Sequence, residues 1–490
     1  MNTKAFFSYL NLMKFDFCIL FGGMGYIIQS MAVTTLVEDK VCNNHLKLNE
    51  SFCADFTSYP DSVETQEILR IANTFKNWQF VIINTPCLLL SIFIGYWLGN
   101  YPKYFKLMLM SVFFGGICQV SLLIVNLFVF KAPWWAILLS YIPYSMCGGI
   151  FLLFSCLYTS ISWGTPSHLV IIRFAVIEFI VKIGMLSSSY SSGAIFAMHP
   201  WIGNHRKNYI GVLLTSLGLN FCGLVYVTLL KPCFVIEKNP EKDDASFSQV
   251  VKDVFQLSRA KQFLSVFSVK RPNQGRLRLI LLITSGAVCN ASLNGEDGIS
   301  YQFAQRVYGL TEDAYTKILT LGYIPPTIAT SIGPSLLKFI GLSDPSIAIF
   351  GCLSLSAFFV IRGIFLSVRG YIAGYIIGSC GRMSSVAIRS LIVSTVEPAE
   401  SAQIFTLSTA LETFVGLGAT FLYTTVFSAT IAHQPGAVML TVGSIIMYPL
   451  AVSLWIRFVQ SKKTEMLTGP NNVEIGAKLS NGQSKQDNVL

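Results

Sequence analysis

Twelve apolar runs, each long enough to cross a membrane as a helix, constrain the fold of this chain more than any other feature. A helix needs about 20 predominantly apolar residues to cross a hydrocarbon layer of about 30 Å. Backbone polar groups in lipid must be paired within the spanning structure, and these runs are too long and uniform for the alternating strands of a barrel. We therefore expect an all-α polytopic membrane protein. The predicted transmembrane helices lie at residues 16–37, 78–98, 107–130, 136–160, 169–192, 209–231, 277–304, 314–338, 345–367, 371–395, 402–430 and 437–458.

The composition supports this class. Hydrophobic residues make up 53% of the chain and the mean hydropathy is +0.58. Charged residues make up only 12%, against about 25% in soluble proteins. A soluble domain has no core large enough to bury that much apolar surface, so lipid is the expected partner of most of it.

Positive charge indicates the orientation. The segment from 231 to 278 holds ten Lys or Arg residues, and Arg457, Lys462 and Lys463 lie at the end of the last run or just beyond it. Short segments rich in Lys and Arg remain in the cytosol, so we expect the central linker and both termini there. The N-terminus lacks a small-residue cleavage site and is expected to be a retained tail. The formal charge of +10 then reflects topology, and it gives little support to a nucleic-acid partner.

The first loop carries the opposite signals. It contains the glycosylation sequon Asn49-Glu50-Ser51 between Cys42 and Cys53. These are the only two of the twelve cysteines that we place in a loop outside the cytosol. We expect a disulfide between them, with two free thiols as the alternative. A second sequon at Asn290 lies inside the seventh run and is expected to be unmodified.

The linker divides the twelve predicted helices into two sets of six. The N-terminal half spans 1–231 with its first loop at 38–76, the linker spans 232–276, the C-terminal half spans 277–458, and a disordered tail spans 459–490. Six plus six helices around a charged linker is the layout of a major facilitator transporter, in which two halves rock about a site near the middle of the membrane.

The fifth run holds the most informative ionisable pair. A charge inside a spanning helix is unfavourable by about 2.5 to 3.5 kcal/mol and usually faces a cavity or a partner. Glu178 lies near the middle of the run, and Lys182 follows four residues later on the same helix face. Glu178 is therefore either a proton-coupling carboxylate or half of a permanently charged pair that braces the helix. Arg173 and His168, near the cytosolic start of the run, are expected to reach the interface, although histidine is the residue type that most often acts as a pH switch.

Three later runs hold further candidates. In the seventh run, Gly295 and Gly298 bracket Glu296 and Asp297, a pattern that suits a broken-helix site or an outer gate; the alternative is a wet, outward-facing pair. Arg389 in the tenth run could bind an anionic substrate or pair with Glu412 of the eleventh. These four ionisable residues are the predicted substrate-binding set.

Motifs of common enzymes are absent from the sequence. We find no GxxxxGK[ST], HExxH or GxSxG and no CxxC pair in a loop. With only five histidines the chain offers little material for a metal centre. We expect no enzymatic activity, no cofactor and no metal.

Four strings resemble one family. They are LVEDKVC, HLVIIRFAVIEFIVKIGM, VAIRSLIVSTVEPAESAQIF and ALETFVGLGATFLYTTVFSAT, which is followed by HQPGAVML. In this order they resemble the proton-coupled folate transporter family, solute carrier family 46 of the major facilitator superfamily, and its invertebrate branch in particular. The resemblance implies that Glu178 takes part in proton coupling and that Arg389 takes part in substrate and proton binding. It also matches His168 to a histidine of the family.

The chain departs from the family at several positions. The superfamily's GxxxDxxGRR gate motif is replaced by GYWLGNYPKYFK, in which Gly95 is kept, Gly99 stands in place of Asp, and Lys103 and Lys106 are the only basic residues. Trp163 stands where the folate transporter has an acidic residue, which argues against folate itself. Lys182 is a further departure, because a built-in counter-ion would restrain Glu178.

The sequence therefore predicts a secondary active transporter that works by alternating access. The expected activity is proton-coupled symport of an organic anion or small conjugate, with the solute and protons as partners. A uniporter of a neutral solute and a non-transporting receptor or scaffold remain as alternatives. Both the plasma membrane and the lysosomal membrane fit the sequence, and the oligomeric state stays open.

Overall fold

The computed structural model describes residues 13–54, 62–203, 207–230, 246–256, 258, 274–297, 299–310, 312–430 and 433–468. Within these ranges every regular element is a helix, which confirms the all-α prediction. The long helices of the N-terminal half are α2 (Asp16–Lys40), α4 (Val63–Asn100), α5 (Phe105–Phe128), α8 (Gly149–Gly164), α9 (Val170–Phe196) and α10 (Tyr209–Leu229). Those of the C-terminal half are α14 (Gly275–Asp297), α16 (Glu312–Phe339), α17 (Asp344–Ile364), α18 (Val368–Ile377), α19 (Met383–Val393), α20 (Pro398–Thr430), α21 (Ala437–Ile445) and α22 (Met447–Thr468).

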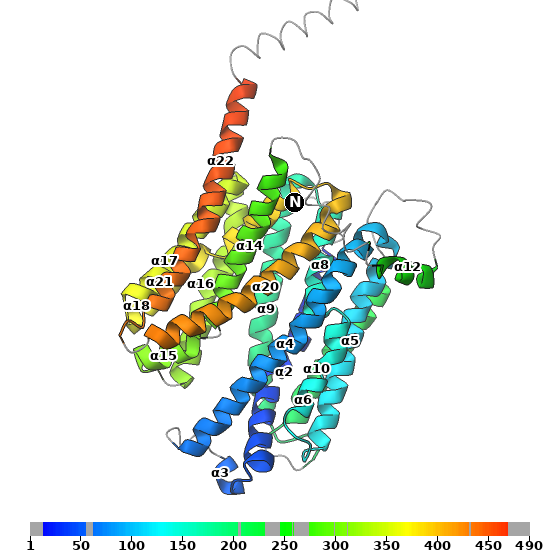
Figure 1. Ribbon diagram of the computed structural model, residues 1–490, viewed down its shortest axis with the longest axis vertical. Coiled ribbons are helices and arrows are strands. Elements are labelled where there is room, and N and C mark those ends of the chain that lie inside the picture. Colours follow the sequence, from blue (N-terminus) through cyan, green and yellow to red (C-terminus); the bar gives the residue numbers. More distant parts are fainter. Residues whose placement is uncertain are drawn as a thin grey trace, which may run out of the picture.

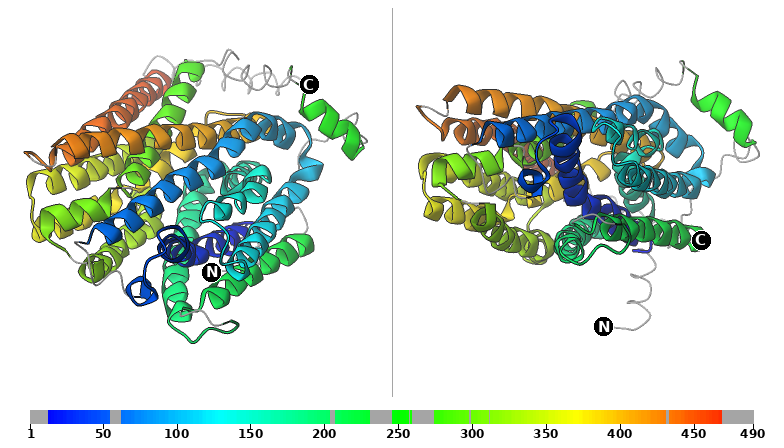
Figure 2. Two further views of the ribbon diagram at one scale, coloured as in Figure 1. Left: turned by 60° about the horizontal axis from the view of Figure 1, so that its bottom comes forward. Right: turned by 90° about the horizontal axis from the view of Figure 1, so that it is seen from below.

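The helices form one elongated bundle made of two groups. In Figure 1 the blue to cyan helices lie on one side together with the green α12, and the other green to red helices lie on the opposite side; the views of Figure 2 show the same grouping. Contacts between the groups are made by α9 with α16 and α19, and by α20 with α4 and α8. One end of the bundle carries the short helix α12 (Phe247–Val254), and the other carries α3 (Glu50–Ala54). We call these the α12 end and the α3 end.

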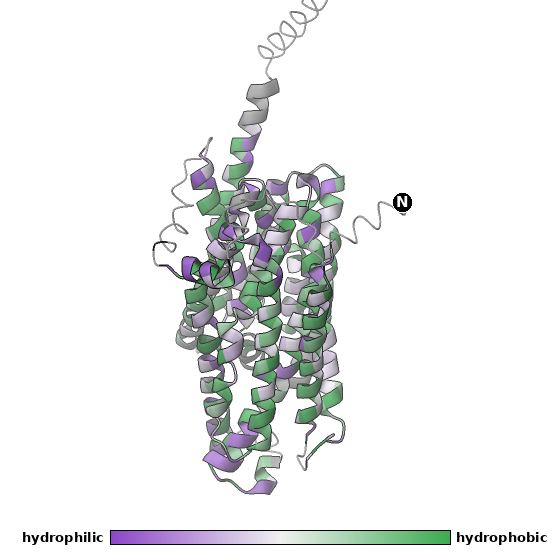
Figure 3. Ribbon diagram, turned by 90° about the vertical axis from the view of Figure 1, so that its right-hand side faces the viewer, coloured by the Kyte–Doolittle hydropathy of each residue, from purple (hydrophilic) through white to green (hydrophobic). Residues whose placement is uncertain are grey.

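The surface of the bundle is that of a membrane protein. Apolar residues predominate along the helices in Figure 3, whereas polar residues gather at the two ends and at some interior positions. Among the described residues, nine helices are long and apolar enough to cross a membrane, or ten if the bent pair Val63–Ser91 and Phe93–Asn100 is one span. The predicted total of twelve is not directly confirmed, because α9 and α16 occupy predicted spans but are not in that set.

Several predicted boundaries are wrong. Helix α4 begins at Val63, inside the loop expected at 38–76, because residues 63–77 continue the helix beyond its apolar part. The seventh predicted helix is divided into α14 and α15 (Ser300–Tyr308). Helix α22 continues to Thr468, so the first ten residues of the expected disordered tail are helical. Residues 469–490 and most of the linker lie outside the described residues.

The fourth span of each half is interrupted, which the hydropathy pattern does not reveal. In the N-terminal half, α6 (Ala136–Leu139) and α7 (Ile142–Met146) precede α8, and the break contains Gly148 with a φ of +84°. In the C-terminal half, a turn at Gly378–Cys380 separates α18 from α19. A Cβ atom on Gly378 would lie 2.5 Å from the Cβ of Phe358, so only glycine allows this close approach. Matching interruptions in two transporter halves point to the binding site.

The α3 end carries the expected first-loop features. Cys42 and Cys53 are joined by a disulfide. Asn49 lies between them and is exposed. The buried ammonium of Lys40 donates to the carbonyls of Val129 and Ala132, both at 3.3 Å, which ties this loop to the end of α5.

Candidate functional site

Three charged side chains meet where the two halves face each other. Arg389 of α19 donates from Nη1 to Oε1 of Glu178 on α9 at 2.7 Å. Its Nη2 lies 3.5 Å from Oε2 of Glu412 on α20. The Arg389–Glu178 bond joins the C-terminal half to the N-terminal half, whereas the Arg389–Glu412 contact stays within the C-terminal half. Sequence reasoning selected all three residues, and the structure brings them together.

The arginine of this triad is also covered by an aromatic ring. The guanidinium carbon of Arg389 lies 4.5 Å from the ring centroid of Tyr158 on α8, a cation–π distance. The side chains of Arg389, Glu178 and Glu412 are only 8%, 12% and 14% exposed. At this degree of burial each charge depends on its partners more than on water.

The triad lines a cavity of about 430 Å³ between the halves. Its walls combine charged, amide and aromatic groups, the mixture expected of a small-molecule site. Among the described residues that line it, three side chains are cationic and two are anionic, so the formal charge at neutral pH is one positive. The lining residues include Tyr26, Ile150, Phe154, Tyr158, Glu178, Lys182, Asn290, Asn294, Tyr323, Arg382, Arg389, Thr409 and Glu412.

The cavity lies beside both helix interruptions. Ile150 belongs to the first turn of α8, and Arg382 is the N-cap residue of α19; both line the cavity. The position therefore follows the rule that transporter sites form where corresponding spans of the two halves are broken.

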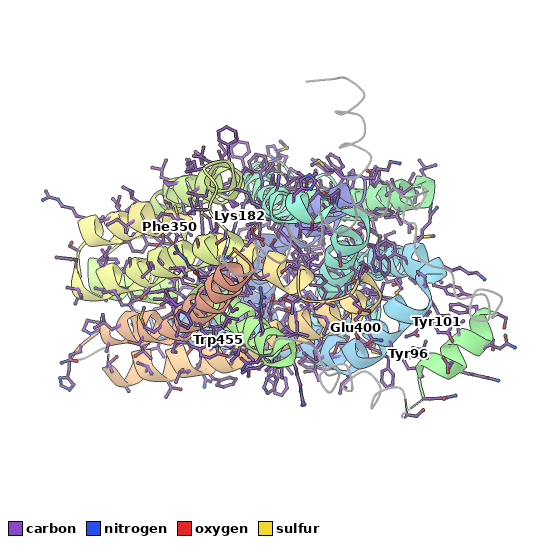
Figure 4. All side chains as sticks on the ribbon, turned by 90° about the horizontal axis from the view of Figure 1, so that it is seen from above. Tyr96, Tyr101, Lys182, Phe350, Glu400 and Trp455 are labelled. Atoms are coloured by element: carbon purple, nitrogen blue, oxygen red, sulfur yellow. A yellow bond between two sulfur atoms is a disulfide. The ribbon has the colours of Figure 1, made fainter. Side chains whose placement is uncertain are left out.

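Lys182 lines the cavity but forms no ion pair with Glu178, although one of the two alternatives drawn from the sequence required that pair. Among the described residues the Glu178 carboxylate bonds to Arg389 instead. The ammonium of Lys182 lies 5.3 Å from the ring centroid of Tyr323 on α16 and 3.8 Å from Sδ of Met185. Lys182, labelled in Figure 4, belongs to α9, where the halves meet.

Arg382 and Asn290 are two of the lining residues that sequence reasoning missed. Arg382 carries a guanidinium that has no hydrogen bond or ion pair among the described residues, although it lies inside a predicted span. Asn290 was noticed only as a sequon, yet its side chain lines the cavity and its buried Nδ2 has no hydrogen-bond partner in the described structure. Arg389 was selected because a charged side chain inside a spanning helix is energetically unfavourable, and the same argument applies to Arg382.

Glu296 lies in a separate buried pair. Its Oε1 accepts from Nη2 of Arg362 on α17 at 2.9 Å, and both side chains are almost fully buried, so the wet alternative is wrong for Glu296. The rings of Phe358 and Tyr371 lie 4.7 and 4.6 Å from the Arg362 guanidinium carbon. Glu296 lines a small chamber of about 40 Å³ that Arg382 also borders. The side chain of Asp297, and Gly298, lie outside the described residues.

Arg173 does not reach the interface, contrary to the prediction. Its Nη2 donates to both oxygens of Asp16 at 2.7 and 3.0 Å, and Nη1 donates to Thr165 at 3.2 Å. The side chain of Asp16 is fully buried and that of Arg173 is 8% exposed. The pair joins α2 to α9 near the α12 end. Asp16 was overlooked because it stands at the edge of the first apolar run.

The α12 side of the triad is closed by aromatic contacts between the halves. The ring centroid of Phe405 on α20 lies 5.7 Å from that of Tyr158 and 5.9 Å from that of Phe174. The indole N–H of Trp163 at the end of α8 donates to the Pro398 carbonyl at the start of α20, at 2.9 Å. The cavity and this closure therefore share Tyr158.

The residues of the expected gate loop lie around the connection between α4 and α5. Gly95 and Gly99 lie in α4, Lys103 lies 5.5 Å from the Tyr104 ring centroid, and Lys106 donates to the Thr228 carbonyl.

Helix α12 of the linker packs against this loop. The hydroxyls of Tyr96 and Tyr101 donate to Oδ2 of Asp253 at 3.2 and 2.7 Å, and both tyrosines are labelled beside α12 in Figure 4. Val250 and Val254 are buried against the same tyrosines. The loop is therefore bound to the linker.

His168 stays away from the cavity. It lies in an exposed turn at Ser167–Leu169 and is not a lining residue. In the described ranges no three His, Cys, Asp or Glu side chains are placed to hold a metal ion.

Comparison with known proteins gives one relative and many similar structures. No protein-family model matches the chain. The "Probable peptidoglycan muropeptide transporter SLC46" of Drosophila melanogaster is 23% identical over 360 residues, which cover 71% of this chain. The match spans 66% of the fly protein, slightly less than two thirds of its length.

Three of the similar solved structures are transporters by their descriptions. The human organic anion transporter MFSD10 (TETRAN) superimposes with a TM-score of 0.65 at 12% identity, covering 90% of this chain and 99% of that one. The proton:xylose symporter XylE gives 0.61 at 12% identity, with 92% and 96% covered. The Escherichia coli fucose:proton symporter FucP gives 0.56 at 12% identity, with 89% and 98% covered. These likenesses show a shared fold.

Proposed function

We propose that this chain is an SLC46-like member of the major facilitator superfamily and a proton-coupled symporter that moves an organic anion by alternating access. One observation carries the proposal: the triad of Glu178, Arg389 and Glu412 joins the two halves and lines the cavity between them. Protonation of the carboxylate in an ion pair between the two halves would weaken the contact that holds the halves together.

Protonation of Glu178 would change the bond between the halves. A neutral carboxyl group loses most of its attraction for Arg389, whereas Glu412 keeps Arg389 within the C-terminal half. The groups that face Glu178 are Arg389, Tyr158, Lys182, Arg382 and Glu412. Loss of the inter-half ion pair favours separation of the halves at the cavity and hence the change of access.

Protonation would also favour an anionic solute. The cavity has one net positive charge when Glu178 is ionised and two when it is protonated. An anion therefore binds more tightly to the protonated state, and by linkage the anion also promotes protonation. This reciprocity is the thermodynamic requirement of symport.

The solute that we propose is an acidic conjugate of the muropeptide class. The fly relative is named for muropeptides and the human structural neighbour for organic anions. A muropeptide joins an amino sugar to a short peptide and carries free carboxylate, amide and hydroxyl groups. The cavity offers cations, the amides of Asn290 and Asn294, and tyrosine rings to these groups.

The α12 end is proposed to face the cytosol. Helix α12, the part of the linker that the structure describes, lies at this end, and the linker sequence holds eight Lys and Arg residues. The disulfide and the exposed Asn49 lie at the other end. The structure would then be the state that is closed toward the cytosol by Phe405 and Trp163. Plasma and lysosomal membranes both fit this orientation.

Uptake into proteoliposomes tests the proposal. Purified protein is reconstituted, and entry of a radiolabelled muropeptide is measured with and without an inward proton gradient. Symport predicts accumulation above the external concentration only with the gradient. A uniporter, in which the Glu178–Arg389 bond is a permanent brace, would equilibrate the solute at one rate under both conditions. That result would replace the proposed mechanism.

A further inference from the structure

We infer that Arg382, Lys182 and Asn290 form a subsite that binds a carboxylate of the solute, separate from the Glu178–Arg389–Glu412 triad. This inference rests on the proposed transport function and assigns the chemical group that the cavity recognises. The three residues come from α9, α14 and the start of α19, and all of them line the cavity.

Arg382 is half-buried and differs from the buried arginines of the bundle. Arg173, Arg362 and Arg389 each bond to a carboxylate, at 2.7, 2.9 and 2.7 Å. The Arg382 guanidinium has no such partner within the described part of the chain, and Glu296, which shares its small chamber, is bonded to Arg362. A guanidinium at membrane depth requires a counter-anion. Because its fork matches a carboxylate with two parallel bonds, the solute is a suitable source.

Asn290 supplies an independent indication of a ligand. Its Nδ2 is buried and lacks a hydrogen-bond partner among the described residues. Buried amide donors are almost always paired in folded proteins, so this donor on the cavity wall suits an acceptor group of a bound solute. A carboxylate that accepts from Arg382 has further lone pairs for this amide.

Lys182 adds positive charge from the opposite half. Its ammonium lies over the Tyr323 ring on the same cavity wall. Arg389 is a weaker candidate for this role, because binding the solute would compete with its contacts to Glu178 and Glu412. The broken span contributes too: Arg382 caps α19, whose N-terminal end favours negative charge. The subsite thus leaves the triad available for the proton.

A matched pair of probes tests the subsite. The first is a radiolabelled muropeptide with one free carboxylate, and the second is the same compound with that carboxylate converted to a primary amide. Full-length protein in proteoliposomes is assayed for KM and maximal rate under an inward proton gradient. We expect Arg382→Gln to raise KM for the acid by about tenfold or more, as loss of a charge-assisted bond does, and to leave KM for the amide unchanged. Gradient stimulation should persist in this variant.

Control variants separate recognition from folding. Arg369→Gln removes an exposed arginine at the start of α18 and should change neither KM. Asn290→Ala should raise KM for the acid by a smaller factor than Arg382→Gln, and Arg382→Lys should restore part of the loss. Equal effects of Arg382→Gln on acid and amide, or none on either, would overturn the inference.

A binding readout keeps the inference distinct from the transport proposal. The unfolding temperature of detergent-purified wild type should rise with the acid more than with the amide, and this difference should vanish in Arg382→Gln. Wild type that distinguishes the two ligands in this way but does not accumulate the acid would refute symport and support the subsite. Wild type that responds equally, or not at all, to both compounds would refute the subsite.

Discussion

Glu178 and Arg389 are bonded at 2.7 Å across the boundary between the two halves, from helices α9 and α19. Arg389 is held a second time, by Glu412 of its own half. The first bond must change whenever the halves separate at the cavity, while the second need not. Protonation of Glu178 would therefore weaken the bond between the halves and leave the Arg389–Glu412 contact within the C-terminal half.

The Asp16–Arg173 pair is predicted to be structural. Replacing Asp16 with Asn leaves the Arg173 guanidinium buried without its counter-charge, which costs on the order of 3 to 5 kcal/mol. We expect a clearly lower unfolding temperature of the purified protein in detergent. Gradient stimulation of the remaining folded fraction should be normal, because neither residue lines the cavity.

A double variant checks this assignment. Asp16→Leu combined with Arg173→Met removes both charges and should recover most of the lost stability. If the double variant is as unstable as Asp16→Asn, lost packing rather than an unpaired charge explains the defect.

Trp163 is predicted to hold the α12 side closed. Trp163→Phe keeps an aromatic ring but removes the donor to the Pro398 carbonyl. One hydrogen bond contributes about 0.5 to 1.5 kcal/mol, so the population open at the α12 end should rise roughly two- to tenfold.

Cysteine labelling measures this opening. A cysteine in place of Thr409, which lines the cavity, is labelled with an impermeant maleimide applied from the α12 side. The labelling rate should be roughly two- to tenfold higher when Trp163→Phe is also present than when Trp163 is kept. Trp163→Phe without the added cysteine is the control, because its labelling measures the background from native thiols. An unchanged rate would show that the bond does not control access.

Asn49 is predicted to carry the N-glycan of this chain. It is exposed at the α3 end, whereas Asn290 of the second sequon lies within α14 and lines the cavity. Protein expressed in animal cells should shift on a gel after glycosidase treatment, and the shift should be absent in Asn49→Gln but retained in Asn290→Gln. A shift that survives Asn49→Gln would contradict the proposed orientation.

The sequence predicted the helical class and selected the three residues of the triad, though not their contact, for one physical reason. Charges are rare in apolar runs, and Glu178, Arg389 and Glu412 are conspicuous there. The same argument applies to Arg362 and Arg382, which lie in the predicted spans 345–367 and 371–395 but were not selected.

Other features depend on tertiary contacts that no linear pattern contains. Arg173 is buried because Asp16 lies beside it, 157 positions earlier. Lys182 and Glu178 share a helix face, yet a distant arginine is the carboxylate's partner. The interruption at Gly378 follows from its close packing on Phe358, whereas hydropathy shows only a continuous apolar run.

Proton coupling through Glu178 is the central claim, and one comparison tests it most directly. Initial muropeptide uptake is measured in proteoliposomes with and without an inward proton gradient, for wild type, for Glu178→Gln, and for Glu67→Gln, which removes a partly exposed carboxylate paired with Arg70. We predict roughly tenfold stimulation by the gradient in wild type and Glu67→Gln. Glu178→Gln, which mimics the protonated state, should show no stimulation while still exchanging labelled for unlabelled solute. Full stimulation in Glu178→Gln would contradict the account.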